Sequence, residues 1–589
     1  MTRKSASRYP GGRDIMSGVT EESPKQHKTG RASQPGPARK PGPTPPDPNA
    51  PMNYIIDRRK VVFGVGFSIL SAASIRHLDK ADSVVTTTPR PADPADNATV
   101  DAVTGQPINT APAEEFAAAP EAAGPFEAPV LDASARLQPG QQADVVLTGG
   151  RIIDPETGFD RIGNIAMIGS TIVEISDQPI AAGRSVDVTG LVVSPGFIDI
   201  LSYQPNGYGE WWKIADGVTT NLGMHGLRFT AERFYSDWNF TGVPINFGGA
   251  VHNSWARQQV GFVPDEAASA TDITAISQIV ETEVRAGYLG IHAQPEYAPG
   301  VSENELLDMG RMAASLSVPL CVHARFSDTT NTELQAQAIR ELIDVADTTG
   351  CHVHVEHLNS TGGTTRMAEA LGELSAAIDG GLSMSSCMYP YEFWATYLGT
   401  SRFVGWEEKY GLSFEDLQVA GTNVRLTEET YSDALSQNAL TAAYAIPRSD
   451  LELGVQAPFM MIGSDAILER PHNNHPRSTG AFCRTIGEFS RNRGLISLVD
   501  ALAMLTIRPA NLTSIGSDQM ARKGRLQIGA DADITVFDAT TIIDQSTIEN
   551  PAQESRGVEF VYVNGTEVRN RDGNVSGVSP GVAITSNFA

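Results

Sequence analysis

Positive charge is scarce in this chain of 589 residues, which carries 44 Lys and Arg against 69 Asp and Glu. The formal net charge is −25 at pH 7. Because binding to nucleic acids depends mainly on neutralising phosphates with Lys and Arg, we exclude a nucleic-acid partner. Only residues 1–60 are basic, with 12 Lys and Arg against 5 Asp and Glu. The acidic remainder is typical of a solvated protein surface.

Cysteine is also scarce. The four residues are Cys321, Cys351, Cys387 and Cys483. They are far apart and include no Cys-x-x-Cys pair, which argues against a disulfide framework and favours buried free thiols. Cysteine usage therefore does not indicate a cellular compartment.

The N-terminal region lacks an apolar run long enough to cross a bilayer as a helix, which takes about 20 residues. Its apolar run, Val61 to Ile75, is shorter and follows Arg58-Arg59-Lys60. A basic flank before a short apolar core is typical of an export signal, and paired arginines favour the twin-arginine route. We expect residues 52–79 to be such a signal or a membrane tether, which makes the protein periplasmic or membrane-tethered in a bacterium. If the run is an incidental apolar helix, a cytoplasmic location follows.

The chain is too long to fold around one ordinary hydrophobic core, so we expect a large domain with additional segments. Residues 1–51 are rich in Pro, Gly, Ser, Lys and Arg and lack hydrophobic periodicity, so we expect disorder there. Residues 80–140 repeat Ala, Pro, Asp and Glu, a composition typical of an extended linker.

The rest of the chain alternates strand-like and helical patterns. Eight strands are expected at residues 196–202, 218–224, 244–251, 288–293, 318–324, 351–357, 381–389 and 459–464. The helical patterns between them predict a (β/α)8 TIM barrel over residues 196–505. The gap at 392–458 is too long for one crossover and predicts an insertion beside the active site. Short strands in residues 141–195 and 506–589 predict a small β-sandwich domain built from both ends of this region.

Three of the expected strands run into a polar side chain. His323 and His357 follow apolar segments, and Asp465 follows Met460-Met-Ile-Gly-Ser464. The carboxyl ends of barrel strands meet at one rim, which is where such barrels do chemistry. Neutral imidazole is a good zinc ligand, and a nearby carboxylate can move the proton of an activated water. The sequence therefore predicts a metal site at this rim.

These strand ends belong to a longer series of motifs. They are Val193-Ser-Pro-Gly-Phe-Ile-Asp199, Gly217-Val-Thr-Thr220, Glu296-Tyr-Ala-Pro-Gly300, Val322-His-Ala-Arg325, Val355-Glu-His-Leu358, Tyr389-Pro-Tyr391, Gly463-Ser-Asp465, His475-Pro-Arg477, Gly529-Ala-Asp-Ala-Asp533 and Val563-Asn-Gly565. In this order, over residues 142–570, the chain resembles the amidohydrolase superfamily and specifically its N-acyl-D-amino-acid deacylase (D-aminoacylase-like) branch. The resemblance implies a TIM barrel of the metal-dependent hydrolase type that uses Zn²⁺.

The resemblance also implies roles for single residues. His323 and His357 match the two histidines that hold the tighter metal, and Asp465 matches the catalytic acid/base. The third ligand in this branch is a cysteine after the second strand. His225 lies near that place, one residue out of register, and is expected to replace the cysteine. Where the family has a His-x-His pair for a second metal, residues 201–203 read Leu-Ser-Tyr. We therefore expect one Zn²⁺ per chain, held by three neutral histidines with one position open.

Two more histidines follow expected strands. His252 ends the third strand and His292 the fourth, and both are expected to line the pocket. Either becomes the third ligand if His225 does not. For all of these histidines the competing interpretation is a core residue bound by backbone groups.

Arg477 matches the residue that binds the substrate carboxylate in the family, because a guanidinium can grip both oxygens. The competing interpretation is a surface salt bridge. Weaker substrate-binding candidates are Tyr297 and one of Tyr389 or Tyr391. Tyrosine beside proline is also typical of simple packing.

Four further histidines are weaker candidates. By strand alternation, His352 and His354 lie on the opposite face from His357 and should point away from the barrel interior. His472 and His475 fall in a polar loop, where solvated side chains are equally expected.

We therefore expect a hydrolase that cleaves a carbon–nitrogen bond, namely the amide of a small N-acyl-D-amino acid. In this interpretation Asp465 moves the protons and Arg477 holds the carboxylate. Two alternatives stay open. One is another amidohydrolase reaction, such as hydrolysis of a cyclic amide or a dipeptide. The other is an inactive barrel that only binds a ligand, since a fold alone does not determine function.

Overall fold

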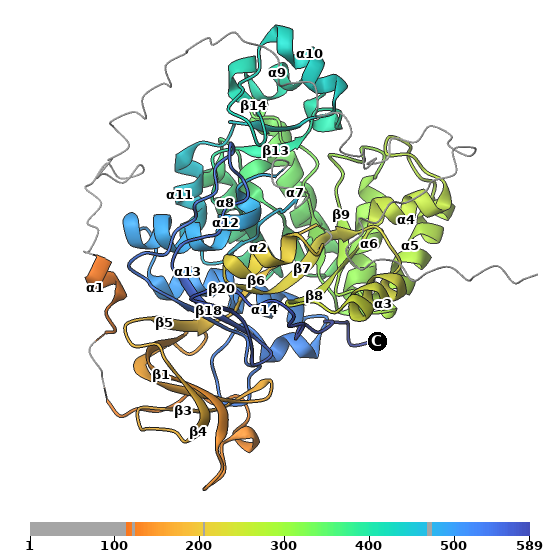
Figure 1. The fold of residues 1–589 in the computed structure, drawn as a ribbon. Helices are drawn as coiled ribbons and strands as arrows, with labels where there is room; N and C mark the ends of the chain where they lie inside the picture. Colours follow the sequence, from red (N-terminus) through yellow and green to blue (C-terminus); the bar gives the residue numbers. More distant parts are fainter. Residues whose placement is uncertain (1–112, 121–123, 204–205, 468–473) are drawn as a thin grey trace, which may run out of the picture. The chain divides into compact units, whose positions relative to one another are not determined.

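The computed structural model describes residues 113–120, 124–203, 206–467 and 474–589. Its centre is a sheet of eight parallel strands in the order β16-β12-β11-β10-β9-β8-β7-β6 (Figure 1). The strands are β6 (Phe197–Asp199), β7 (Val218–Leu227), β8 (Asn246–His252), β9 (Ile291–Ala293), β10 (Leu320–Val322), β11 (Val353–Val355), β12 (Met384–Met388) and β16 (Met460–Ile462). A parallel bridge between Ser202 and Ala466 brings the ends of the two edge strands together. Each of the eight expected strands is present, which confirms the predicted TIM barrel.

Side chains fill the inside of the barrel. Met224, Cys321 and Cys387, from three different strands, belong to one buried cluster. The neighbouring positions Val322 and Met388 belong instead to the larger cluster that includes the helices. This alternation follows from the two-residue period of a strand. All four cysteines are buried free thiols, as expected.

Helices cover the outside of the barrel (Figure 1). They are α2 (Gly209–Ala215), α3 (Ala231–Thr241), α4 (Asn253–Val260), α5 (Ala270–Arg285), α6 (Glu303–Leu316), α7 (Thr332–Thr349), α8 (Met367–Asp379), α11 (Arg448–Gln456), α12 (Arg477–Arg484), α13 (Leu498–Leu505) and α14 (Ile507–Ser514). Their ends follow ordinary capping chemistry. Asn331 caps α7 by accepting from the Leu334 N–H, and α7 ends at Gly350 in the left-handed region (φ 69°).

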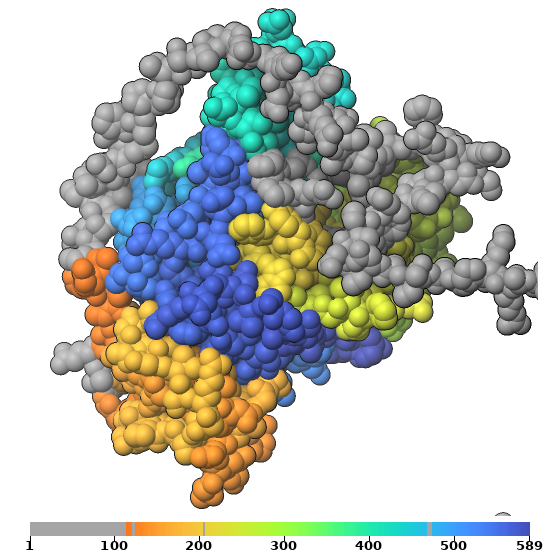
Figure 2. Space-filling view, viewed as in Figure 1, coloured from red at the N-terminus to blue at the C-terminus, as the bar shows by residue number. Residues whose placement is uncertain are grey.

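A nine-stranded sheet is assembled from both ends of the enzyme-sized region, as predicted. Its strands are β1 (Ala143–Asp154), β2 (Phe159–Ile168), β3 (Thr171–Ser176), β4 (Ala182–Asp187), β5 (Val192–Pro195), β17 (Ile534–Phe537), β18 (Val558–Val563), β19 (Thr566–Asn570) and β20 (Gly573–Asn574). The two halves join where β5 pairs antiparallel with β17, with Val193 opposite Val536. In Figure 2 the blue C-terminal surface meets the orange and yellow surface of the N-terminal strands.

The connection between β12 and β16 holds the predicted insertion, drawn in teal at the top of Figure 1. Three of its strands form an antiparallel sheet in the order β13-β15-β14. Its elements are β13 (Trp394–Tyr397), α9 (Trp406–Tyr410), β14 (Leu417–Val419), α10 (Glu428–Ser436) and β15 (Leu440–Ala443). The hydroxyl of Ser401 donates to the carbonyl of Glu296, 3.2 Å away, so the insertion contacts the loop after β9.

Most of the N-terminal expectations fall outside the described residues. The leader and export signal lie within residues 1–79, and most of the linker at 80–140 is also outside. The described end of that linker, residues 124–140, lies along the sheet, where Val130 forms a parallel bridge with Ile528. Within the described part of the chain, none of the helices combines the length and hydropathy needed to cross a membrane.

Candidate metal centre and active site

Three histidines meet at the carboxyl end of the barrel. His225 lies near the end of β7, His323 directly follows β10, and His357 lies two residues after the end of β11. One ring nitrogen from each can be chosen so that the three lie within 4.8 Å of one another, and all three side chains are buried. Nδ1 of His323 is 3.0 Å from Nε2 of His357. Three imidazoles at this spacing suit a zinc ion that keeps one position open.

The carboxylates of Glu356 and Glu296 bind ring nitrogens of these histidines. Glu356 accepts from Nδ1 of His225 at 2.6 Å, and its other oxygen lies 3.2 Å from Nδ1 of His292. Glu296 lies 2.5 Å from Nε2 of His323. Neither carboxylate was assigned a role from the sequence. In the sequence, only their positions indicate a role. Glu356 directly precedes His357, and Glu296 is the first residue of the motif Glu296-Tyr-Ala-Pro-Gly300.

Burial and charge set the protonation of these groups. Burial lowers the pKa of His323, and lowers that of His357 well below its ordinary value, so both rings are neutral. Burial also acts to lower the pKa of His225, but the charge of Glu356 outweighs it and the pKa is raised. Burial acts to raise the pKa of Glu356, but its two histidine partners hold that pKa well below the ordinary value. Glu356 is therefore ionised.

The strand-alternation argument for His354 is wrong. His354 pairs in register with Cys321, a residue of the interior cluster, so it faces inward rather than away from the barrel. The error arises because β11 ends at Val355 and His357 has a left-handed backbone (φ 28°). The two-residue period cannot be counted across that turn. His352 binds the hydroxyls of two serines, with its Nδ1 2.8 Å from Ser383.

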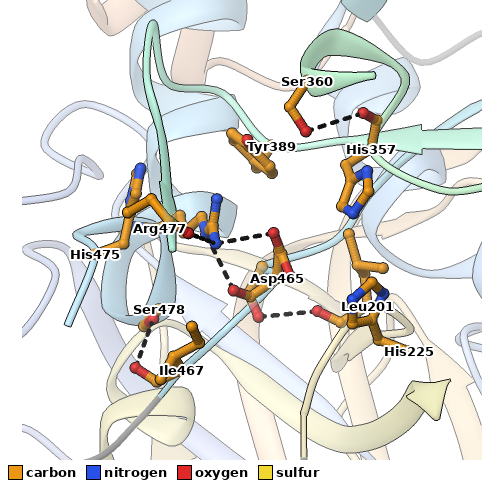
Figure 3. Close-up of polar contacts among 12 residues, drawn as sticks. Leu201, His225, His357, Ser360, Tyr389, Asp465, Ile467, His475, Arg477 and Ser478 are labelled. Carbon is orange, nitrogen blue, oxygen red and sulfur yellow. Dashed lines mark hydrogen bonds and ion pairs between the residues drawn. The ribbon is translucent and has the colours of Figure 1, made fainter. Parts of the chain in front are cut away.

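Asp465 lies between the histidines and an arginine (Figure 3). It follows β16 with a left-handed backbone (φ 46°), and its N–H donates to the carbonyl of Leu201 at 2.6 Å. Oδ2 of Asp465 is 2.8 Å from Nη2 of Arg477. Oδ1 is buried and has no hydrogen-bond partner among the described residues. One oxygen is therefore fixed while the other is left for a ligand.

Arg477 is a buried site residue rather than part of a surface salt bridge. Its Nε donates to the backbone carbonyl of Asp465 at 3.0 Å, and its guanidinium lies 4.5 Å from the centre of the Tyr389 ring. Its Nη1 is buried without a partner in the described structure. His475 is buried as well, so of the two alternatives that the sequence leaves open for it, solvation is excluded. Its Nε2 bonds to the carbonyl of Phe393 at 2.9 Å, while His472 lies outside the described residues.

Residues 201–203 are the segment for which the resemblance implies a His-x-His pair. Leu201 is buried and packs so tightly on Gly463 that a Cβ there would lie 2.3 Å from the Leu201 Cβ. The ring of Tyr203 meets His225 edge-on, with centroids 4.8 Å apart. Neither Leu201 nor Tyr203 supplies an imidazole ligand of the kind that a His-x-His pair gives to a second metal.

The remaining candidates differ in their surroundings. His252 has both ring nitrogens engaged, since Nδ1 accepts from the Ser254 N–H at 3.1 Å and Nε2 lies 2.9 Å from Arg228. It therefore caps α4 and offers no free nitrogen. His292 faces Glu356, as described above. Tyr297 lies beside His323, with ring centroids 5.0 Å apart.

Arg402 reaches the site from the insertion. It donates to the carbonyl of Ser360, and its guanidinium lies 4.2 Å from the Trp394 ring centre. Burial acts to raise the pKa of Glu296, but Arg402 and His323 bring it down to about 2. Arg402 therefore keeps Glu296 ionised as an acceptor for His323. No motif in the sequence pointed to this arginine.

Comparison with known proteins agrees with this geometry. Residues 405–569 match the model of the amidohydrolase family. An N-acyl-D-glutamate deacylase of Alcaligenes xylosoxydans xylosoxydans is 26% identical over 478 residues, which is 73% of this chain and 94% of the relative. A D-aminoacylase of the same organism is 28% identical over 475 residues, 73% of this chain and 95% of the relative.

Solved structures share the fold. A D-aminoacylase structure superposes with a TM-score of 0.67 at 24% identity, over 75% of this chain and 100% of that one. An N-acyl-D-glutamate deacylase from Bordetella bronchiseptica, complexed with zinc and a phosphonate inhibitor, gives 0.68 at 23% identity, over 76% and 100%.

The barrel, the sheet from both chain ends and the histidines at the strand ends define an amidohydrolase, a hydrolase of carbon–nitrogen bonds other than peptide bonds. Within that superfamily the chain is similar to N-acyl-D-glutamate deacylase and D-aminoacylase.

Proposed function

We propose that the protein removes the acyl group from an N-acyl-D-amino acid, using one Zn²⁺ per chain and Asp465 as the acid/base. The observation that carries the proposal is the meeting of three buried histidine nitrogens within 4.8 Å at the rim that also carries Asp465. The names of the two curated relatives, one a D-aminoacylase and the other a deacylase of N-acyl-D-glutamate, support the substrate class.

The donor set fits zinc. His225, His323 and His357 would hold the ion, and the last two are already neutral, the state in which imidazole binds a metal. Nδ1 of His357 has no partner within the described structure, so this ring bonds only through Nε2. A zinc ion bound there supplies Lewis acidity, which polarises an amide carbonyl and acidifies water.

Asp465 is placed to move the proton. Its Oδ1 is the buried oxygen without a partner, while Oδ2 is held by Arg477. The free oxygen takes a proton from the attacking water and then delivers it to the leaving amine nitrogen. Because its backbone is fixed by the bond to Leu201, the carboxylate keeps one position through both transfers.

Arg477 binds the carboxylate of the substrate. Its unpartnered Nη1 is a donor already inside the site, and the Tyr389 ring fixes the plane of the guanidinium. The hydroxyl of Tyr389 is also buried in the site and offers a second donor. Tyr297, beside His323, lines the same space.

The test is zinc content and turnover of the full chain, with Asp465→Asn as the variant. We expect one zinc per chain, turnover of N-acyl-D-amino acids by the wild type, and a loss of at least about 10²-fold in kcat for the variant with its zinc retained. A wild-type chain that binds no zinc when zinc is supplied favours the inactive, ligand-binding barrel. Turnover only of cyclic amides or dipeptides favours the other amidohydrolase reaction.

A further inference from the structure

Glu356 is a fully buried carboxylate that faces two histidines and no cation of Lys or Arg in the described structure. Its Oε2 lies 2.6 Å from Nδ1 of His225, and its Oε1 lies 3.2 Å from Nδ1 of His292. Each oxygen therefore accepts from a different ring. An ionised carboxylate in the core is costly unless such bonds satisfy it.

This arrangement fixes which nitrogen of His225 is available. Because Nδ1 carries the proton donated to Glu356, only Nε2 is left for a metal shared with His323 and His357. The bond also holds the ring plane, since the carboxylate is itself held by His292 on its other oxygen.

We propose that Glu356 is the positioning residue of the metal centre: it selects the tautomer and orientation of His225 and makes that ring a stronger ligand. The proposal rests on the zinc site put forward under Proposed function. Three neutral imidazoles bring no negative charge to a divalent ion, and Glu356 supplies one from directly behind a ligand. Carboxylates behind metal-binding histidines raise metal affinity in this way, and their loss typically costs about 10–100-fold.

The same three residues could instead hold a second ion, because donor atoms of His225, His292 and Glu356 also lie within 4.8 Å of one another. Each oxygen of Glu356 bonds to a different histidine ring, which argues against a second metal ion at these residues. An ion bound to one oxygen would gather both ring nitrogens around itself. Two separate N–H donors, one for each oxygen, give the arrangement observed.

The experiment compares Glu356→Gln with the wild type in the full chain, by competition for zinc with a chromophoric chelator. The glutamine keeps the size of the side chain, but its amide nitrogen cannot accept a hydrogen bond from a histidine. We expect zinc to bind about 10–100-fold more weakly, at an unchanged one ion per chain. Equal affinity overturns the proposal, and so does a fall from two ions per chain to one.

The matched control is Glu305→Gln. Glu305 is also fully buried, but it binds Asn253, with Nδ2 2.8 Å away, and Arg257, rather than any of the three ligand histidines. Both variants lose a buried charge, so both are expected to lower the melting temperature. Only Glu356→Gln is expected to weaken zinc binding.

A crystal structure of the zinc-loaded wild-type chain tests the proposal even if Glu356→Gln does not fold. Nε2 of His225 on the metal and Nδ1 on Glu356 support it, whereas Nδ1 or Glu356 on the metal overturns it. The two proposals fail differently. A wild type without zinc removes both, while a wild type that binds zinc through Nδ1 of His225 removes only the role of Glu356.

Discussion

Two residues of the site hold strained backbone conformations. His357 (φ 28°) and Asp465 (φ 46°) lie in the left-handed region, which costs a residue other than glycine about 1–3 kcal/mol. Each lies two or three residues after the last residue of a barrel strand, and each N–H is held by a neighbouring strand or loop. The His357 N–H donates to Sγ of Cys387 at 3.3 Å, and the Asp465 N–H donates to Leu201. The barrel thus stabilises two turns that place the side chains of His357 and Asp465 at its mouth.

Arg477 combines two tasks, since it holds Asp465 and offers a free Nη1. We expect Arg477→Lys to reduce kcat/KM for N-acyl-D-amino acids by about 10–100-fold, the loss of one charged hydrogen bond. Lysine keeps the charge but cannot reproduce the planar fork. Steady-state kinetics with the substrate and with its carboxamide analogue measure the effect, which should be larger for the carboxylate.

A suitable control for this change is Arg484→Lys. Arg484 also lies over a tyrosine, 4.8 Å from the Tyr391 ring centre, and donates to the Pro390 carbonyl. Among the described residues its ion partners are Glu392 and Asp544 rather than Asp465, so Arg484→Lys should leave the preference for the carboxylate unchanged. An equal loss on both substrates for Arg477→Lys would contradict carboxylate binding by this residue.

At the scale of single elements, β7 has an irregular end that carries His225. Its pairing with β8 shifts in register between Gly223 and Leu227, and Gly226 within that shift has φ 88°. A Cβ at Gly226 would lie 2.6 Å from Cδ2 of His292. The bulge therefore bends the end of β7 around the ring of His292. Glu356 binds both this ring and the ring of His225.

Replacing Gly226 with Ala should disturb this arrangement through both strain and collision. We expect a loss of about 1–3 kcal/mol in unfolding free energy, together with weaker zinc binding. Thermal unfolding and zinc titration measure the two effects. Gly381→Ala is the control, because Gly381 has φ 96° but no neighbour within 4 Å of an added Cβ. Similar zinc affinity for both variants would argue against the proposed coupling.

The strands were predictable because their signals are local. Most of the eight are short segments that contain apolar residues, and a turn or a polar residue such as His323 marks the end of several of them. The partners of the polar residues were not predictable in the same way. The contact of Glu356 with His225 depends on which strands face one another across the barrel, and Arg402 reaches Glu296 from an insertion more than 100 residues later. The error at His354 has the same origin, since one left-handed residue reverses the count along a strand.

At the scale of the whole molecule, a chain with a net charge of −25 at pH 7 buries some of its acids and thereby raises their pKa. Burial raises the pKa of Glu210 from 4.5 to about 8 and that of Asp216 from 3.8 to about 6. Between pH 4.5 and about 8 the folded chain holds a proton on Glu210 that the unfolded chain has released. The stability due to this group is complete below pH 4.5 and is lost as the pH rises through about 8.

Glu210→Gln removes that dependence. Relative to the wild type, the variant should gain stability between pH 4.5 and pH 8.5, on the order of 4 kcal/mol in unfolding free energy. Melting temperatures of both proteins across this range measure the difference, and all other groups cancel in the comparison. A constant difference across the range would show that Glu210 titrates at its ordinary pKa.

The pairing of β5 with β17 has a consequence for folding during synthesis on the ribosome. Pro195, at the end of β5, precedes its partner Ile534 by about 340 residues, and translation adds roughly 5–20 residues per second. The edge of β5 therefore waits roughly 17–70 s, while the whole barrel is being made, with its backbone donors and acceptors exposed. A chain released early ends with that edge unpaired. Nascent chains of this protein should accordingly depend on chaperones until the last strands emerge.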